Sequence, residues 1–487
     1  MNEPCCAGPG ALPLAGPGQS PGLPFLTLQT REDRREAGRA LRRVVPRGAQ
    51  GGWAAPATRA DPVAAVLAQE AGRIAELLPR RHGLMAASPL AYLRGAASVM
   101  AADLATQPAA GLRVQACGDC HLMNFGAFAS PEGVALFDIN DFDETLPAPF
   151  EWDVKRLATS LVLAGREAGL DEAGSAALAR GAARAYGEAL AALAALDPLE
   201  CWSRRIDLEA AVAAIGDKGA RHDARARMRR ALEGGATQYG LLERDGAGWL
   251  LRDDVAGMFR LPSHDAAVHA AFGAYRRTLQ EDRQVLLRRY RLADWAFKVV
   301  GVGSVGTFCA IGLFLSGDGA PLLLQIKQAE RSALAPFAGE SDYAAQGERV
   351  VTGQRMMQAA SDIFLGWARM PAAAAGVAAG PEHVYVRWLK DSRLGAVGAR
   401  VEARSLASYA ALCGRTLARA HTRSGDAATL SGYVGGAGFA RAVTAFARDY
   451  ADQATLDWRA FTEAIAAGRV SHEPPAPHEP PAQGGPR

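Results

Sequence analysis

The densest group of polar residues in this sequence is the run Cys117-Gly118-Asp119-Cys120-His121-Leu122-Met123-Asn124, and a second run, Phe137-Asp138-Ile139-Asn140-Asp141-Phe142-Asp143-Glu144, follows it. The apolar stretches 112–116 and 134–139 are predicted as short buried strands, joined by a loop that contains Asn124 and several turn-forming residues. Five acidic side chains around two strands repel one another unless a cation lies among them. Mg²⁺, which binds carboxylate and phosphate oxygens, would remove that repulsion.

The spacing of these polar residues indicates a reaction class. Asp119 and Asn124 stand five residues apart, the spacing of the catalytic aspartate and the metal-binding asparagine in kinase catalytic loops. Asp141, after the next strand, stands where a second metal-binding aspartate belongs. The runs resemble the aminoglycoside-phosphotransferase-like branch of the protein-kinase superfamily, and Asp153 matches the start of a helix in that branch. The resemblance implies that Asp119 orients and deprotonates an acceptor hydroxyl, supported by His121, while Asn124 and Asp141 hold Mg²⁺.

A glycine-rich segment predicts the nucleotide-binding half of such a site. It reads Gly301-Val302-Gly303-Ser304-Val305-Gly306, and a predicted strand rather than a helix follows it. This context favours a hairpin lying over the phosphates of ATP, formed by Gly301, Gly303, Ser304 and Gly306. Lys327 ends the third strand of a predicted antiparallel meander (297–302, 307–315 and 321–327), and a lysine there needs an anion. We expect Lys327 to bind phosphate and Glu348, in the next helix (341–360), to orient it.

Together these patterns predict an α+β, two-lobed, protein-kinase-like fold with a small antiparallel sheet lobe and a larger helical lobe. The catalytic-loop residues precede the glycine-rich segment, so the lobes are encoded in reversed order, as in a circular permutation. The predicted organisation is a disordered tail (1–34), a helical lobe (35–296), a β-rich lobe (297–400), returning helices (401–468) and a proline-rich disordered tail (469–487). The helical lobe is expected to be helical from about Glu151 to Trp295, with interruptions near 201–206 and 234–265. The last two strands of the small lobe are expected at 362–368 and 383–390, before a linker near Lys390.

Over most of its length the chain resembles an uncharacterised bacterial family, the domain of unknown function 2252. The resemblance spans about residues 35–468 and rests on several runs. These are Ser88–Gly95, Cys117–Gly126, Phe137–Glu144, Phe150–Asp153, Gly353–Arg355 and Ala420–Asp426. The family name implies no reaction, so the chemistry has to be argued from the residues.

Composition sets the surroundings of this chemistry. The chain has 487 residues, 49% of them hydrophobic and 22% charged, with a net charge of +3. No apolar run approaches the roughly 18 residues of a membrane span and no secretory signal is visible, so we expect a cytoplasmic protein without membrane or nucleic-acid partners. Seven arginines in Arg31–Arg47 are interpreted as a solvated arm. The acceptor substrate and the oligomeric state stay open.

Other functions compete with phosphoryl transfer. A related enzyme could transfer AMP from ATP, or the kinase-like shell could bind nucleotide without catalysis. A metal-dependent hydrolase could use Asp119, His121, Asp138, Asp141 and Asp143. The Cys117-x-x-Cys120-His121 pattern fits c-type haem attachment but lacks an export signal, and no second pair of ligands stands at zinc spacing. His421 either ends its helix or supports the catalytic loop.

Overall fold

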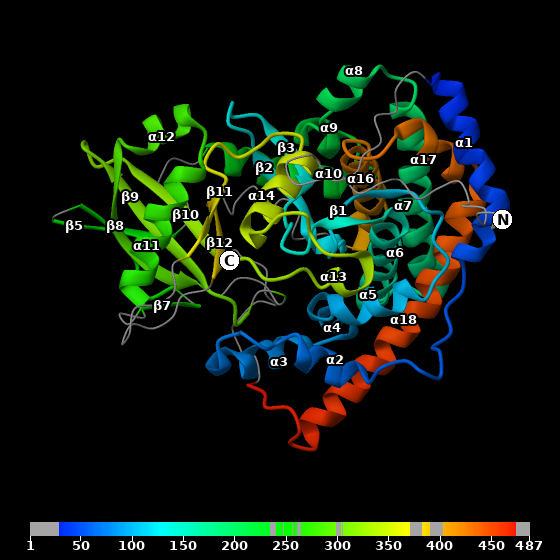
Figure 1. The fold of residues 1–487 in the computed structure, drawn as a ribbon, viewed down its shortest axis with the longest axis horizontal. Coiled ribbons are helices and arrows are strands. Elements are labelled where there is room, and N and C mark those ends of the chain that lie inside the picture. Colours follow the sequence, from blue (N-terminus) through cyan, green and yellow to red (C-terminus); the bar gives the residue numbers. More distant parts are fainter. Residues whose placement is uncertain are drawn as a thin grey trace, which may run out of the picture.

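The computed structural model describes residues 29–233, 240–246, 248–255, 257–260, 264–298, 303, 305–370, 382–389 and 403–473. The architecture is α+β: a large helical part lies beside a smaller part built on a six-stranded antiparallel sheet (Figure 1). Within the described residues, no helix is both long enough and apolar enough to cross a membrane.

The large part is assembled from both ends of the chain around the buried helix α6 (Phe150–Glu167). The C-terminal helices α16 (Leu406–His421) and α18 (Ala437–Ala466) pack against α6 and α7 (Glu172–Leu193). The other helices of this part are α1 (Arg31–Val44), α2 (Pro62–Ala68), α3 (Leu78–Ala86), α4 (Pro89–Gly95), α5 (Ala97–Ala105), α8 (Pro198–Ser203), α9 (Leu208–Ala213), α10 (Lys218–Glu233) and α17 (Ala427–Val434).

Two antiparallel ribbons carry the polar runs of the large part. Strand β1 (Arg113–Ala116) pairs with β4 (Leu146–Pro149), and β2 (Phe125–Ala129) pairs with β3 (Ala135–Ile139). A turn of 3₁₀ helix, η3 (Leu122–Asn124), leads into β2. The ribbons therefore bring the loop after β1 and the loop after β3 to the same end of the large part.

The smaller part holds a sheet with the strand order β11-β12-β10-β9-β8-β7. Alternation along β10 (Pro321–Gln328) assigns its two faces: Leu324 and Ile326 join the apolar cluster beneath α11 (Asp265–Tyr275), so Gln325 and Lys327 point to the opposite face. The remaining elements are β5 (Leu242–Asp245), β6 (Gly248–Leu251), β7 (Met258–Phe259), β8 (Tyr290–Lys298), β9 (Cys309–Ser316), β11 (Gly366–Arg369), β12 (His383–Trp388), α12 (Glu281–Leu287), α13 (Ala335–Ala338) and α14 (Gln346–Met357).

Helix α14 contacts both parts of the molecule. Two of its glycines allow the helix to lie close to the sheet on one side and to the large part on the other. A Cβ on Gly347 would lie 2.2 Å from the carbonyl oxygen of Val384 in β12, and one on Gly353 would lie 2.4 Å from Thr145 of the large part. Neither position has room for a side chain. The helix is therefore held between the sheet and the loop that follows β3.

The antiparallel meander is confirmed, with β8, β9 and β10 in sequential pairing, but its first strand spans Tyr290–Lys298. The helix predicted to run to Trp295 is wrong there, because β8 alternates in burial along its first residues as a strand does. Strand β2 replaces part of the predicted loop. Gly126 lies in it because a Cβ would be 2.5 Å from Nδ2 of Asn140, so this glycine marks a close approach rather than a turn.

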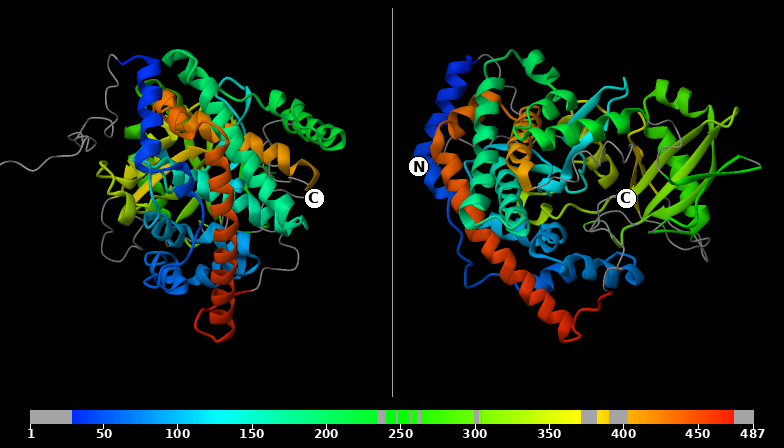
Figure 2. Two further views of the ribbon diagram at one scale, coloured as in Figure 1. Left: turned by 90° about the vertical axis from the view of Figure 1, so that its right-hand side faces the viewer. Right: turned by 180° about the vertical axis from the view of Figure 1, so that it is seen from behind.

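The ends of the chain also differ from expectation. Helix α1 begins at Arg31 and packs along α17, where Arg34 pairs with Asp426, so this segment is not a solvated arm (Figure 2). Near the other end, Val470 is buried and the amide of Glu473 donates to Pro79, so the predicted tail from 469 begins with packed residues. Residues 1–28, 474–487 and the predicted linker near Lys390 lie outside the described residues.

Candidate functional site

The loop after β1 is held in shape from inside the large part. Gly118 has a φ of +83°, and a Cβ there would lie 2.5 Å from the carbonyl oxygen of Glu144, so the turn requires glycine. The carboxylate of Asp153, in the first turn of α6, accepts hydrogen bonds from the amides of Cys117 (2.8 Å) and Gly118 (3.0 Å). This contact fixes the main chain immediately before Asp119.

His421 belongs to the same support. Its Nε2 lies 3.1 Å from Oδ2 of Asp153, and its Nδ1 lies 2.9 Å from the hydroxyl of Tyr186. All three side chains are buried. Of the two interpretations of His421, the structure favours support of the loop, through Asp153.

Asp119 lies at the tip of this loop, with one oxygen engaged and one available. Arg156 of α6 donates to Oδ1 from Nε (2.7 Å) and from Nη2. Among the described residues no hydrogen bond is made to Oδ2, and Nε2 of His121 lies 3.5 Å from it. Burial opposes ionisation, but the charge of Arg156 and its hydrogen bonds outweigh burial and lower the pKa of Asp119. The carboxylate is therefore ionised, with Oδ2 left to meet a ligand.

His121 is a buried, neutral side chain in this loop. Burial lowers the pKa of His121 to about 3, against the opposing charge of Asp119. Its Nδ1 accepts from the amide of Met123 at 3.2 Å, so the proton is on Nε2, which faces Asp119. This is the buttressing role expected for it.

Asn124 and the residues after β3 form the second wall of the site. The side-chain Nδ2 of Asn124 donates to the main-chain carbonyl of Asp119 at 2.7 Å. The main-chain carbonyl of Asn124 accepts from the amide of Asn140 at 2.8 Å. The first bond fixes the amide plane, so its Oδ1 is the acceptor that stays available. Asp138 is used differently: it is fully buried and binds Arg419 and the amide of Ala359. A hydrolase site that needs Asp138 as a free ligand is therefore not supported.

Lys327 reaches across from the sheet to these acidic residues. Its Nζ forms an ion pair with Asp143 and lies 3.9 Å from Oδ1 of Asp141, while Tyr385 donates to Asp143 as well. Burial and the charge of Asp143 raise the pKa of Asp141, even with Lys327 nearby. The pKa of Asp143 is lowered, because Lys327 and Tyr385 outweigh its burial. One lysine thus faces two carboxylates.

Lys327 pairs with residues other than Glu348, the partner predicted from the sequence. Among the described residues, its ion pairs are those with Asp141 and Asp143, and the expected pair with Glu348 is not one of them. The next residue, Arg349, faces the acidic loop instead and donates to the carbonyls of Asp143 (2.9 Å) and Thr145 (2.7 Å). Neighbouring residues on a helix point about 100° apart, so Glu348 is turned away from this contact.

Residues before α3 and within it hold the glycine-rich segment from the large part. Arg73 donates to the carbonyls of Gly303 (2.9 Å) and Val305 (2.7 Å), and Arg81 donates to Gly303 at 3.1 Å. The amide of Ile74 also donates to the carbonyl of Gly306 at 2.7 Å. Gly301 and Ser304, predicted in the same loop, lie outside the described residues.

These groups surround one cavity of about 130 Å³. Of the predicted residues, it brings together Asp119, His121, Asn124, Asp141, Lys327 and Gly303, but neither Glu348 nor Gly306 lines it. Its polar lining also includes Asp143 and Glu144 of the acidic run, and residues that the sequence did not single out, namely Gln69, Arg73, Arg81, Arg94, Gln328, Glu330 and Arg387. In the sequence, the position of Lys327 at the end of an apolar strand pointed to it. Nothing comparable distinguishes these arginines among so many.

The donor set suits a hard divalent cation. Asn124, Asp141 and Asp143 line the cavity, and their side-chain oxygens are the hard ligands that such an ion prefers. The pKa of Asp141 is raised first by burial and then by the charge of Asp143, and a bound cation would offset both effects. Among the described residues, one cluster of cysteine and aspartate side chains also has the spacing of a metal site. It consists of Cys117, Cys120 and Asp153, whose ligand atoms lie within 4.8 Å of one another. There the oxygens of Asp153 already accept from main-chain amides, and burial raises the pKa of the Cys120 thiol to about 11. Buried, protonated thiols also disfavour haem attachment.

The sequence model of one family, an uncharacterized protein conserved in bacteria (domain of unknown function 2252), matches residues 73–464. The chain belongs to this family. No curated protein and no solved structure gives a significant match. The matched region of the 2252 family contains every polar group that lines the cavity except Gln69, which precedes it.

Proposed function

We propose that this protein is a kinase-like, Mg²⁺- and ATP-dependent phosphotransferase that acts on a hydroxyl group of an acceptor. The observation that carries the proposal is the convergence of Asp119, Asn124, Asp141 and Lys327 on one cavity. These residues come from two distant segments of the chain and occupy the roles of the corresponding groups in kinases.

The arrangement of the sheet part supports the same proposal. Along the chain, a glycine-rich connection between β8 and β9 precedes the lysine-bearing strand β10, the helix α14 and two further strands. This is the order of a kinase small lobe. The catalytic-loop candidate precedes the sheet in the chain, so we infer a circularly permuted kinase-like fold.

Each residue has a defined task in the proposed reaction. Oδ2 of Asp119 accepts the hydrogen bond of the acceptor hydroxyl and orients it towards the γ-phosphate, while Arg156 holds the carboxylate in place. Lys327 exchanges its contact with Asp143 for the phosphate oxygens, and Arg73 keeps the glycine-rich segment over them. Asn124 and Asp141 would hold Mg²⁺, which neutralises phosphate charge when bound. Most of the rate gain comes from positioning and electrostatics.

One observation favours a second candidate, a nucleotide-binding protein without turnover. The ion pair with Arg156 lowers the pKa of Asp119, and a carboxylate of lowered pKa is a weak general base. Phosphoryl transfer through a loose transition state needs little base strength, so we retain catalysis as the main proposal. Mass spectrometry of the product formed from labelled ATP distinguishes the candidates. A phosphotransferase adds the γ-phosphate to the acceptor, an AMP-transferring enzyme adds AMP, and a protein without turnover adds neither.

Thermal unfolding with and without Mg²⁺ and ATP tests the nucleotide site. The midpoint temperature of unfolding of the wild-type protein should rise by several degrees at saturating MgATP, because a ligand that binds only the folded state stabilises it. Lys327→Met should lose most of this gain, whereas Lys218→Met, which changes an exposed lysine at the start of α10, should keep it. An absent gain in the wild type, or an equal gain in Lys327→Met, would contradict the proposal.

A further inference from the structure

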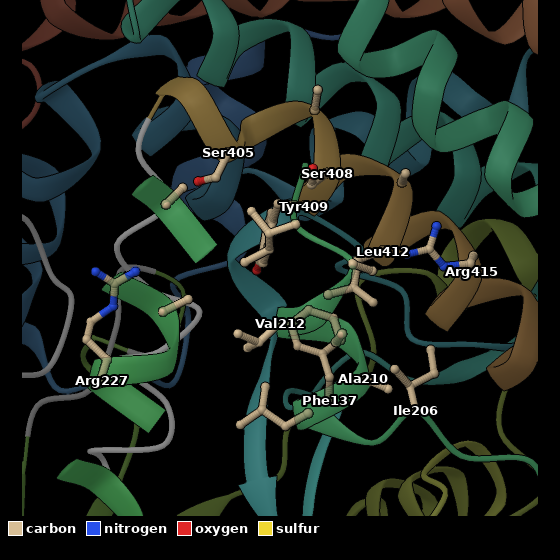
Figure 3. Close-up of a pocket in the computed structure, with 18 residues that line it drawn as sticks. Phe137, Ile206, Ala210, Val212, Arg227, Ser405, Ser408, Tyr409, Leu412 and Arg415 are labelled. Carbon is tan, nitrogen blue, oxygen red and sulfur yellow. The ribbon is translucent and has the colours of Figure 1, made fainter. Parts of the chain in front are cut away.

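A second and larger cavity, of about 670 Å³, lies in the helical part (Figure 3). Its walls are the segment from Ile206 through α9, the helix α10, the N-terminal half of α16 and the side chain of Phe137 in β3. Small-molecule sites usually measure roughly 300–1,000 Å³ and are mostly apolar with a few polar groups. The cavity fits both criteria.

Its lining is strongly apolar. Ile206, Leu208, Val212, Ile215 and Leu412 line it, together with seven alanines, Ala210, Ala211, Ala214, Ala220, Ala224, Ala407 and Ala411. These small side chains leave the space open between the helices. An occupant must therefore present mostly apolar surface.

Two arginines interrupt this apolar lining, on opposite sides of it in Figure 3: Arg227 of α10 and Arg415 of α16. Within the described part of the chain, neither forms an ion pair, and Nε of Arg227 is buried without a hydrogen-bond partner. Asp223, four residues before Arg227 on the same helix, is engaged with Arg404 instead. A buried guanidinium nitrogen without a partner costs free energy that an anionic ligand would recover.

We propose that this cavity binds a long-chain fatty acid, with its carboxylate on Arg227 and its hydrocarbon chain along α9 and α16. A fatty acid has one carboxylate on a long hydrocarbon chain, and this matches the one half-buried guanidinium, that of Arg227, in an otherwise apolar part of the cavity. Arg227 is the chosen contact because Arg415 is exposed to solvent and already hydrated. The proposal does not depend on the phosphotransferase assignment.

The cavity also touches the site described above. The hydroxyl of Tyr409 lies 2.9 Å from the carbonyl oxygens of both Leu122 and Phe125, at the two ends of η3. The ring of Phe137 packs edge-on against Tyr409, with centroids 5.8 Å apart. The wall that an occupant contacts is therefore the wall that holds Asn124 in position.

Titration of the purified protein with the fluorescent fatty acid cis-parinaric acid, followed by competition with palmitate and with hexadecanol, tests the proposal. We expect saturable fluorescence that palmitate displaces at least tenfold more effectively than the uncharged alcohol. Arg227→Gln should weaken binding of the fatty acid about tenfold, the effect of losing one charge-assisted hydrogen bond. Arg225→Gln, on the same helix but exposed and outside the cavity, should bind as the wild type does.

A second variant tests the location independently of charge. Ala224 is buried in the cavity wall, so Ala224→Phe should fill the space and abolish binding. If this variant does not fold, judged by circular dichroism, the comparison of Arg227→Gln with Arg225→Gln decides. Non-saturable binding, equal displacement by hexadecanol, equal affinities of the two arginine variants, or wild-type affinity in a folded Ala224→Phe would each overturn the proposal.

Discussion

The ammonium nitrogen of Lys327 lies 3.9 Å from Oδ1 of Asp141, and this contact joins the sheet to the acidic loop of the helical part. Lys327 is shared with Asp143, so Asp141 has only part of a countercharge, and burial together with Asp143 raises its pKa. A bound cation would complete the balance of charge. Several consequences of this arrangement can be measured.

Asp141→Asn should weaken the dependence of nucleotide binding on Mg²⁺. The amide keeps the size of the side chain but removes the negative charge that attracts a divalent ion. We expect the Mg²⁺ concentration that gives half of the ATP-induced thermal shift to rise at least tenfold. Asp452→Asn, an exposed aspartate paired with Arg166, is the control and should leave the Mg²⁺ titration unchanged. An unaltered titration in Asp141→Asn would remove this residue from the metal site.

Asp119→Asn should separate catalysis from binding. Asparagine can still accept from the buried Arg156, so the loop keeps its support, but the orienting carboxylate oxygen is lost. Loss of a positioned acid or base typically costs about 10²–10⁴ in rate. We expect kcat to fall in this range once an acceptor is known, with the ATP-induced thermal shift preserved. A variant that loses nucleotide binding and turnover together would assign Asp119 to binding instead.

Much of the site could be predicted from the sequence, because its residues lie in short runs with fixed spacing. Asp119, Asn124 and Asp141 are brought together by β2 and β3, a hairpin between neighbouring segments. Lys327 stood out as a lysine at the end of an apolar strand, where it needs an anion. For such local patterns the spacing carries the geometry.

Contacts between distant segments could not be predicted in this way. The position of Arg349 towards the acidic loop, with Glu348 turned away, depends on the rotation of α14 about its axis, which tertiary packing at Gly347 and Gly353 fixes. Similarly, Arg73 reaches Gly303 only because the segment before α3 crosses from the helical part to the sheet. The sequence pattern of a helix or strand does not specify which distant element packs against it, so these contacts cannot be predicted from the pattern.

Arg73→Ala should impair nucleotide binding more than the chemical step. The side chain makes two hydrogen bonds to carbonyls of the glycine-rich segment, and their loss frees that segment from its position over the phosphates. We expect the KM for ATP to rise about tenfold, with kcat changed less, since each bond contributes about 1 kcal/mol. Arg180→Ala, on the exposed side of α7, serves as the control. A tenfold fall in kcat with an unchanged KM for ATP would contradict a role of Arg73 in holding the glycine-rich segment.

Asp153→Asn should destabilise the whole protein. An amide nitrogen cannot accept a hydrogen bond, so one of the amides of Cys117 and Gly118 would lose its partner inside the core. We expect the free energy of unfolding in urea to fall by about 2–4 kcal/mol. Asp171→Asn is the matched control, because this N-cap carboxylate accepts from Gly174 through one oxygen and asparagine caps equally well. Equal stabilities of the two variants would show that the loop does not depend on Asp153.

Glu151→Gln should change how stability depends on pH. Glu151 is 1% exposed, and burial raises its pKa to about 7, although the amide of Ala110 donates to it. A raised pKa means that the folded state binds the proton more tightly, so this contribution is complete below the unfolded pKa and is lost as pH rises towards about 7. Relative to Glu151→Gln, the wild type should lose up to about 3 kcal/mol of unfolding free energy between pH 4.5 and 7.5. Urea unfolding at several pH values measures this difference, with the exposed Glu463→Gln as the control. Parallel pH profiles of the wild type and Glu151→Gln would mean that Glu151 ionises in the core without cost.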